Sequence, residues 1–227
     1  MKLNHITDVF FDLDHTLWDF DRNSKLTFQQ IFKEQNISIV IDDFLEVYMP
    51  INLKYWRLYR EDKIEKPALR YHRLKETFDA LDYKVSDELI DLISEDYIRY
   101  LPNHNYLFSN TVEVLEYLKN KYELHIITNG FEEVQNLKLE KSGIDKFFKQ
   151  IITSECVGVK KPNPKVFEFA LEKAEAKPYE SIMIGDSYEA DVMGALNSGM
   201  MAIHFSEETK NNGVQRVSSL IELKKYL

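Results

Sequence analysis

The sequence has little cysteine and no long apolar run. Cys156 stands alone among 227 residues, which excludes an internal disulfide framework and favours a reducing compartment. No stretch approaches the roughly 18 apolar residues of a membrane-spanning helix. Asp8, Asp12 and Asp14 interrupt the first apolar stretch, where a signal peptide would have its hydrophobic region. We therefore expect a soluble, cytoplasmic protein that has no membrane partner.

The sequence also lacks an excess of positive charge. Its formal net charge is -9, and it has no long basic run. Both features disfavour binding to a nucleic acid backbone or an anionic membrane surface, so we expect no nucleic acid polymer as a partner. The 227 residues are 44% hydrophobic, which is enough for a sizeable core and a second small domain.

Glycine is absent from the segment 19–103. Apolar residues recur there at three- and four-residue spacing, the pattern of amphipathic helices. Ser86 precedes one of these stretches, "DELIDLISEDYIRYL", in the position of an N-cap. We predict that 19–103 forms a compact bundle of helices.

From residue 104 onward, helical patterns alternate with short apolar runs. The runs are "ELHIITNG", "QIITSE", "SIMIGDS" and "MAIHFS". This alternation predicts an α/β fold, a parallel sheet with helices on both faces. The opening run, "VFFDL", belongs to the same sheet, so the helical bundle is an insertion. The predicted domains are therefore an α/β core of 1–18 and 104–227, and an inserted helical domain of 19–103.

Polar residues follow the predicted strands at their carboxyl ends, where open parallel sheets bind ligands. They are Asp12 and Asp14, then Thr128, Asn129 and Gly130, then Asp186 and Ser187, with Lys160 and Lys161 in a fourth loop. Carboxylates about 4 Å apart repel by about 4 kcal/mol per pair at an effective dielectric constant near 20, so a shared pocket needs a cation. Oxygen ligands without histidine or cysteine favour a hard ion, and we expect Mg²⁺, with Mn²⁺ or another divalent ion as an alternative.

The remaining groups at this edge suit an anion. Lys161 and the backbone amides of Asn129 and Gly130, at a predicted helix start, would face a phosphate. A metal, a lysine, a hydroxyl donor and a carboxylate nucleophile together indicate phosphoryl transfer through an aspartyl-phosphate.

Four motifs make a family resemblance visible. In this order, "DLDHT", "ITNG", "KKPNPKVF" and "GDSYEAD" resemble the motifs of the haloacid dehalogenase superfamily. The insertion after the first motif resembles the family's helical C1-type cap. The resemblance implies a Rossmann-like core with an inserted cap domain.

The resemblance also implies roles for the acidic residues. Asp12 is similar to the nucleophile that attacks phosphorus, and its other oxygen would bind Mg²⁺. Asp14 is similar to the general acid and base, and its backbone carbonyl would bind the metal. Asp186 resembles the third metal ligand, and Asp191 has a supporting role.

The other matching residues would bind the phosphate. Thr128 resembles the hydroxyl that holds a phosphate oxygen, with Asn129 beside it. Lys161, rather than Lys160, matches the lysine that neutralises the nucleophile and the transferring group, because it directly precedes Pro162. Thr16 is expected to brace the first loop.

Several activities are compatible with these motifs. A phosphatase is favoured, because dehalogenases of the family lack an aspartate at the position of Asp14; a phosphomutase and a non-catalytic interaction protein are further alternatives. "IITNGFEEVQNLKLEKSGI" and "VGVKKPNPKVF" resemble the pyrimidine 5′-nucleotidase branch. The expected substrate is a small phosphorylated metabolite, a nucleoside 5′-monophosphate, with a sugar phosphate or phosphoglycolate as the alternative. The sequence predicts no oligomeric state.

Overall fold

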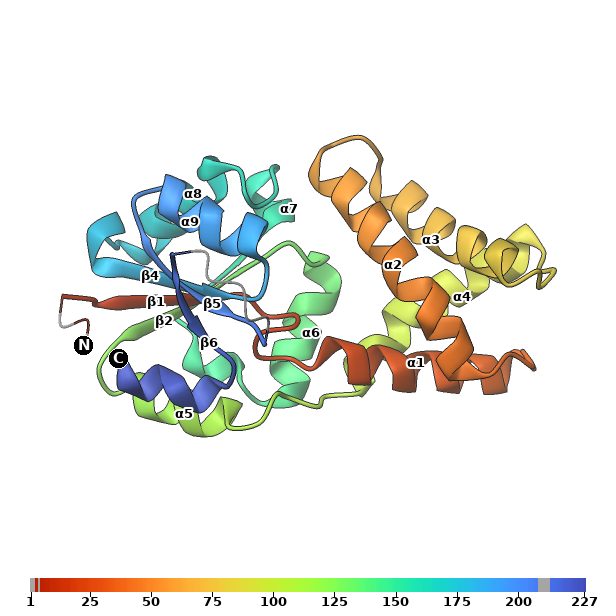
Figure 1. Cartoon of the computed structure of the whole chain (residues 1–227), viewed down its shortest axis with the longest axis horizontal. Coiled ribbons are helices and arrows are strands. Elements are labelled where there is room, and N and C mark those ends of the chain that lie inside the picture. The colour runs from red at the N-terminus through yellow and green to blue at the C-terminus, as the bar shows by residue number, and fades with distance from the viewer. Residues whose placement is uncertain (1–2, 4, 208–212) are drawn as a thin grey trace. The chain divides into compact units, whose positions relative to one another are not determined.

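The structure is a computed structural model that describes residue 3 and residues 5–207 and 213–227. The chain forms two compact units (Figure 1). The first, here called the sheet unit, comprises Met1–Phe20 and Asn105–Leu227. The second, the helical unit, comprises Asp21–His104. None of the described helices combines the length and apolar character needed to cross a membrane.

Within the described chain, the sheet unit contains a six-stranded parallel sheet of order β3-β2-β1-β4-β5-β6. The strands are β1 (Asp8–Phe11), β2 (Glu123–Thr128), β3 (Gln150–Thr153), β4 (Ser181–Gly185), β5 (Met201–Phe205) and β6 (Gln215–Val217). All residues of β1 and β4 are buried, as expected for central strands covered on both faces. The prediction of a parallel α/β fold is confirmed.

Helices cover both faces of this sheet. In Figure 1, α8 and α9 lie on one side of the strands, and α5 lies on the other side with the C-terminal turn. The helices are α5 (Thr111–Leu118), α6 (Glu132–Ser142), α7 (Ser154–Val157), α8 (Pro164–Ala174) and α9 (Gly194–Asn197), with a π-helical turn (Tyr188–Met193) before α9 and short 3₁₀ turns at Asp145–Phe147, Pro178–Glu180 and Leu220–Lys225. Phe167 and Ala170 of α8 pack with Phe10, Ile127 and Met183 of the strands in one buried cluster.

The strand register brings the functional loops to one edge. Phe11 pairs with Ile126 of β2 and with Ile184 of β4, and the Asp12 N–H donates to the Ile184 carbonyl at 2.9 Å. Because all three strands run in the same direction, the residues that follow them lie at the same edge of the sheet.

The helical unit packs around aromatic rings. Its elements are α1 (Phe20–Glu34, beginning at the last residue of the sheet unit), α2 (Ile41–Arg60), α3 (Lys66–Ala80), α4 (Asp87–Tyr100) and a 3₁₀ turn (Leu101–Asn103). The ring of Phe28, which is fully buried, lies 4.7–4.9 Å from the rings of Phe44, Tyr48 and Tyr97. The predicted N-cap of α4 is confirmed, since Ser86 Oγ accepts the Leu89 N–H at 3.3 Å.

The chain leaves and re-enters the sheet unit through two paired segments. Trp18 forms an antiparallel bridge with Leu107, and the Asp19 N–H donates to the Tyr106 carbonyl at 3.0 Å. The two ends between which the helical unit is inserted are therefore held next to each other.

Candidate active site

Lys161 is the central cation at the carboxyl edge of the sheet. Its side chain is 2% exposed, and its Nζ donates to Asp12 Oδ1 at 2.9 Å, Asp191 Oδ1 at 2.5 Å and the Ile127 carbonyl at 2.7 Å. An ammonium group has three protons, so every one has an acceptor. Burial by itself lowers the pKa of Lys161, but Asp12 and Asp191 outweigh burial and raise it above its ordinary value. The side chain is therefore a permanent buried cation.

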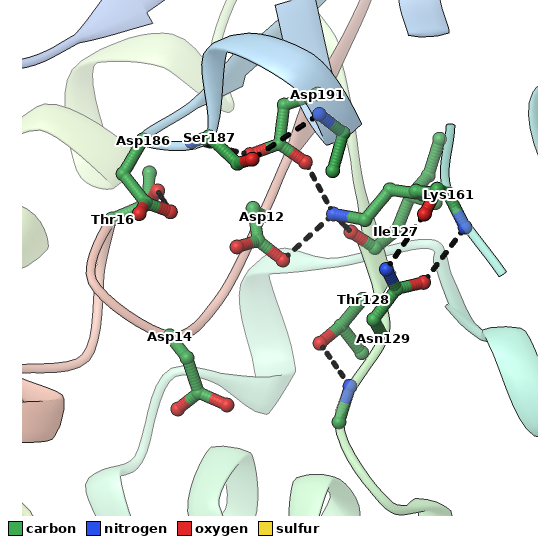
Figure 2. A network of polar contacts seen from close by, with 12 residues as sticks. Asp12, Asp14, Thr16, Ile127, Thr128, Asn129, Lys161, Asp186, Ser187 and Asp191 are labelled. Carbon is green, nitrogen blue, oxygen red and sulfur yellow. Dashed lines mark hydrogen bonds and ion pairs between the residues drawn. The ribbon is translucent and has the colours of Figure 1, made fainter. Parts of the chain in front are cut away.

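Asn129 fixes the backbone of Lys161. Its Oδ1 accepts the Lys161 N–H at 2.8 Å, and its Nδ2 donates to the Lys161 carbonyl at 3.0 Å. Figure 2 shows this pair beside the Lys161 ammonium. The side chain of Asn129 thus joins two loops, and the phosphate contact expected of this residue stays a prediction for its backbone N–H.

Three carboxylates gather around this lysine. Asp12, Asp186 and Asp191 each offer an oxygen, and these oxygens lie within 4.8 Å of one another. Burial is the largest influence and raises the pKa of Asp12 well above its usual range, against the opposing effect of Lys161. Burial, followed by the charge of Asp191, raises the pKa of Asp186 to about 7. Three acids and one lysine leave a net negative site, and its all-oxygen donor set fits a hard divalent cation such as Mg²⁺.

The three acids are not equivalent. Asp191 uses one oxygen for Lys161 and the other for the Ser187 N–H at 3.0 Å, so the protein occupies both oxygens. Gly185 makes room for it, because an added Cβ would overlap the Asp191 carboxylate. In the described part of the chain, Asp186 Oδ1 accepts a long hydrogen bond from Thr16 Oγ1, at 3.5 Å. These contacts suit Asp191 to support the site, and leave Asp12 and Asp186 better placed to hold a metal.

Asp14 is placed apart from the three acids. Figure 2 shows its carboxylate directed away from Asp12 and Lys161. Lys138 Nζ lies 2.6 Å from Asp14 Oδ1, and Gln135 Nε2 donates to Oδ2 at 3.0 Å. Burial lowers the pKa of Lys138, and the nearby Asp14 opposes this effect. The backbone of Asp14, whose carbonyl is the predicted metal ligand, remains in the loop that follows Asp12.

Thr128 ends β2 with its hydroxyl in a hydrogen-bond network. Its Oγ1 accepts the Gly130 N–H at 3.1 Å and Gln135 Nε2 at 2.7 Å. The expectation that the Gly130 N–H faces an anion is therefore wrong, since the hydroxyl of Thr128 takes it.

Sequence reasoning missed Gln135 and Lys138. Within "EEVQNLKLEKSG" both are buried on the inner face of α6, whereas Leu137 is 41% exposed. A helix that buries glutamine and lysine and exposes leucine breaks the usual amphipathic pattern. Burial is a property of the folded chain, so the sequence by itself offered no signal for these two residues.

The parallel sheet collects carboxylates and a buried lysine at its carboxyl edge, where enzymes with a Rossmann-like fold bind their ligands. The chain belongs to the haloacid dehalogenase-like hydrolase family, whose sequence model matches residues 9–205. The predicted family is thereby confirmed.

Two relatives of this chain are phosphatases of different specificity. The chain is 30% identical to pyrimidine 5′-nucleotidase YjjG of Escherichia coli (strain K12) over 226 residues, which cover 96% of each protein. It is 36% identical over 208 residues to a glyceraldehyde 3-phosphate phosphatase of Methanothermobacter thermautotrophicus, covering 88% of this chain and 85% of that protein. The predicted enzyme class, a phosphoric monoester hydrolase, agrees with both.

A solved structure shares the whole architecture. The putative HAD-hydrolase YfnB of Bacillus subtilis, crystallised bound to magnesium, superposes with a TM-score of 0.89 at 27% identity, covering 97% of each chain.

Proposed function

We propose that the protein is a magnesium-dependent phosphatase that hydrolyses nucleoside 5′-monophosphates through an aspartyl-phosphate on Asp12. The observation that carries the proposal is the buried contact of Lys161 with Asp12, beside Asp186 and Asp191. A lysine that neutralises one carboxylate oxygen leaves the second to react, in a pocket whose remaining negative charge calls for a cation.

The residues divide the reaction between them. Asp12 attacks phosphorus as the bond to the leaving oxygen breaks, and Asp14 gives that oxygen a proton. Asp14 then removes a proton from the water that hydrolyses the phosphoaspartate. Thr128 and the Asn129 N–H bind phosphate oxygens. Lys161 acts through its charge, because all three of its protons already have acceptors.

The metal would be held by Asp12, Asp186 and the backbone carbonyl of Asp14, with Asp191 in support. When bound, Mg²⁺ supplies positive charge that offsets the negative charge of the transferring phosphoryl group. The clustered carboxylate oxygens of Asp12 and Asp186 support this assignment, as does the magnesium-bound relative.

Two substrate classes remain in competition. The similarity to pyrimidine 5′-nucleotidase YjjG, which extends over 96% of the chain, favours a nucleotide. The higher identity to a glyceraldehyde 3-phosphate phosphatase, 36%, favours a small sugar phosphate as the second candidate. An aspartate at position 14 favours phosphate ester hydrolysis over dehalogenation in either case.

A phosphate-release screen tests the proposal. With Mg²⁺ present, UMP, dUMP and dTMP are expected to be hydrolysed faster than glyceraldehyde 3-phosphate, phosphoglycolate and hexose phosphates. Faster hydrolysis of the sugar phosphates would select the second candidate. EDTA should abolish turnover and Mg²⁺ should restore it.

Asp12→Asn is the matched variant for this screen. It preserves side-chain size but cannot form the phosphoaspartate, so turnover should fall to background while the melting temperature stays close to that of the wild type. Turnover near the wild-type rate would reject Asp12 as the nucleophile.

A further inference from the structure

Two polar side chains from α6 lie behind the proposed site. Gln135 and Lys138 are one helical turn apart, with 0% and 2% exposure. Burying polar groups is costly unless they form hydrogen bonds, so their partners indicate why they are there. Both have Asp14 as a partner.

The carboxylate of Asp14 is held at both oxygens. Lys138 Nζ binds Oδ1 at 2.6 Å, and Gln135 Nε2 binds Oδ2 at 3.0 Å. Hydrogen bonds to a carboxylate from a charged donor are short and strong. Two donors on separate oxygens fix the plane of the carboxylate as well as its position, which a single contact would leave free to rotate.

Gln135 also sets the direction of the Thr128 hydroxyl. The Thr128 Oγ1 accepts Gln135 Nε2 at 2.7 Å and the Gly130 N–H at 3.1 Å. A hydroxyl has two acceptor lone pairs and one proton, so with both lone pairs engaged it can act toward a third group only as a donor. A phosphate oxygen, which only accepts, is the partner that this orientation suits.

The amide orientation of Gln135 follows from its neighbours. In its ionised form, in which it can act as the base, the carboxylate of Asp14 accepts hydrogen bonds only, so the amide nitrogen faces it. The amide oxygen, Oε1, is consequently buried without a hydrogen-bond partner in the described part of the chain. An unpartnered buried carbonyl is destabilising, so this arrangement serves Asp14 and Thr128 at the expense of stability.

The surroundings hold both side chains in place. The Lys138 ammonium lies 4.3 Å from the ring centroid of Trp18 and 5.3 Å from that of Phe20, within range of cation–π attraction. At position 130 only glycine leaves room, because an added Cβ would overlap the Gln135 amide.

We propose that Gln135 and Lys138 are positioning residues: Lys138 holds the Asp14 carboxyl group in a fixed orientation, and Gln135 couples that group to the donor hydroxyl of Thr128. This inference rests on the proposed function, in which Asp14 protonates the leaving oxygen. A misaligned acid slows the release of an alkoxide, which must be protonated as it leaves. A misaligned acid hardly affects the release of p-nitrophenolate, because this leaving group departs without a proton.

The dependence of kcat/KM on the leaving group therefore distinguishes a loss of positioning from a general disruption of the site. For Lys138→Met, kcat/KM on the preferred alkyl phosphate should fall by about 10²-fold, the lower range for loss of acid catalysis. On p-nitrophenyl phosphate it should fall only severalfold. Gln135→Met should show the same imbalance, together with a raised KM on both substrates, because Thr128 loses its orientation. Lys141→Met, an exposed site on the same helix, is the control and should match the wild type.

A double-mutant cycle tests whether Lys138 acts through Asp14. In the Asp14→Asn background, Lys138→Met should cause no further loss on the alkyl phosphate. Additive losses, or an equal loss on both substrates, would overturn the positioning role of Lys138. For Gln135→Met, an equal loss on both substrates or an unchanged KM would overturn its role in the same way. Melting curves identify any variant that fails to fold. If either Lys138→Met or Gln135→Met does not fold, the kinetics of the variant that does fold test the proposal. A wild-type protein inactive on both phosphates would instead reject the proposed function.

Discussion

Asp12 and Asp186 are carboxylates that the folded protein makes hard to ionise. Burial is the largest cause for both, raising the pKa of Asp12 well above its usual range and that of Asp186 to about 7. Lys161 offsets part of the effect but cannot neutralise three acids. At the scale of single residues, the site therefore carries an electrostatic cost that a divalent cation would relieve.

This cost predicts how pH and magnesium act on stability. A carboxyl whose pKa is higher in the folded than in the unfolded state binds more protons when folded, so without metal the free energy of unfolding falls as pH rises from about 4 to about 7. Mg²⁺ competes with those protons and should stabilise the protein more at pH 8 than at pH 5.5. At a free Mg²⁺ concentration one hundred times its Kd, binding should raise the free energy of unfolding by about 2.7 kcal/mol.

Thermal melts with and without MgCl₂ at the two pH values measure this difference. Asp186→Asn is the control, because it removes one ionisable group from the carboxylate cluster and should shrink the magnesium effect. A magnesium effect that is equal at both pH values would contradict the argument.

Among the elements, α1, α2 and α4 depend on one aromatic side chain. Phe28 of α1 contacts the rings of Phe44 and Tyr48 from α2 and Tyr97 from α4, and is fully buried. Phe28→Ala should lower the free energy of unfolding by about 3–5 kcal/mol, because it leaves a cavity among rings that cannot close around it. Urea unfolding followed by circular dichroism measures the loss.

The matched control is Val40→Ala, at a position 63% exposed, where a change within about 0.5 kcal/mol is expected. A loss for Phe28→Ala no larger than that of the control would mean that the ring cluster contributes little to stability.

At the scale of the whole molecule, the sheet unit is complete without the helical unit. Its six described strands come from outside Asp21–His104, and the cluster around Phe10 and Phe167 is built from its own residues. The hydrogen bond from the Asp19 N–H to the Tyr106 carbonyl keeps the two chain ends adjacent, so a short connection can close them.

We therefore expect that replacing residues 21–104 with a short glycine-serine linker yields a folded protein. It should unfold cooperatively on heating and keep the stabilisation by Mg²⁺, since Asp12, Asp186 and Asp191 all lie in the sheet unit. A gradual melt, or no response to Mg²⁺, would show that the sheet unit needs the helical unit to fold.

Local sequence patterns determined the central sheet. Runs such as "SIMIG" are apolar, short and separated by segments of helical pattern, so the strands and their parallel direction follow from the residues themselves. β6, Gln215–Val217, escaped prediction, because a three-residue edge strand with two polar residues has no such pattern. The segment that follows Ser187 opens with a π-helical turn, Tyr188–Met193.

The sequence by itself also indicated which residues collect at the carboxyl edge, because parallel strands place their following loops together. Only the tertiary structure decided where those side chains point. Asp14 meets Gln135 and Lys138 across 121 and 124 positions of sequence, and Asn129 meets Lys161 across 32. The formation of strands and helices depends on local periodicity, whereas a side chain's direction depends on the donors that packing brings to it from distant segments, and no local pattern encodes those.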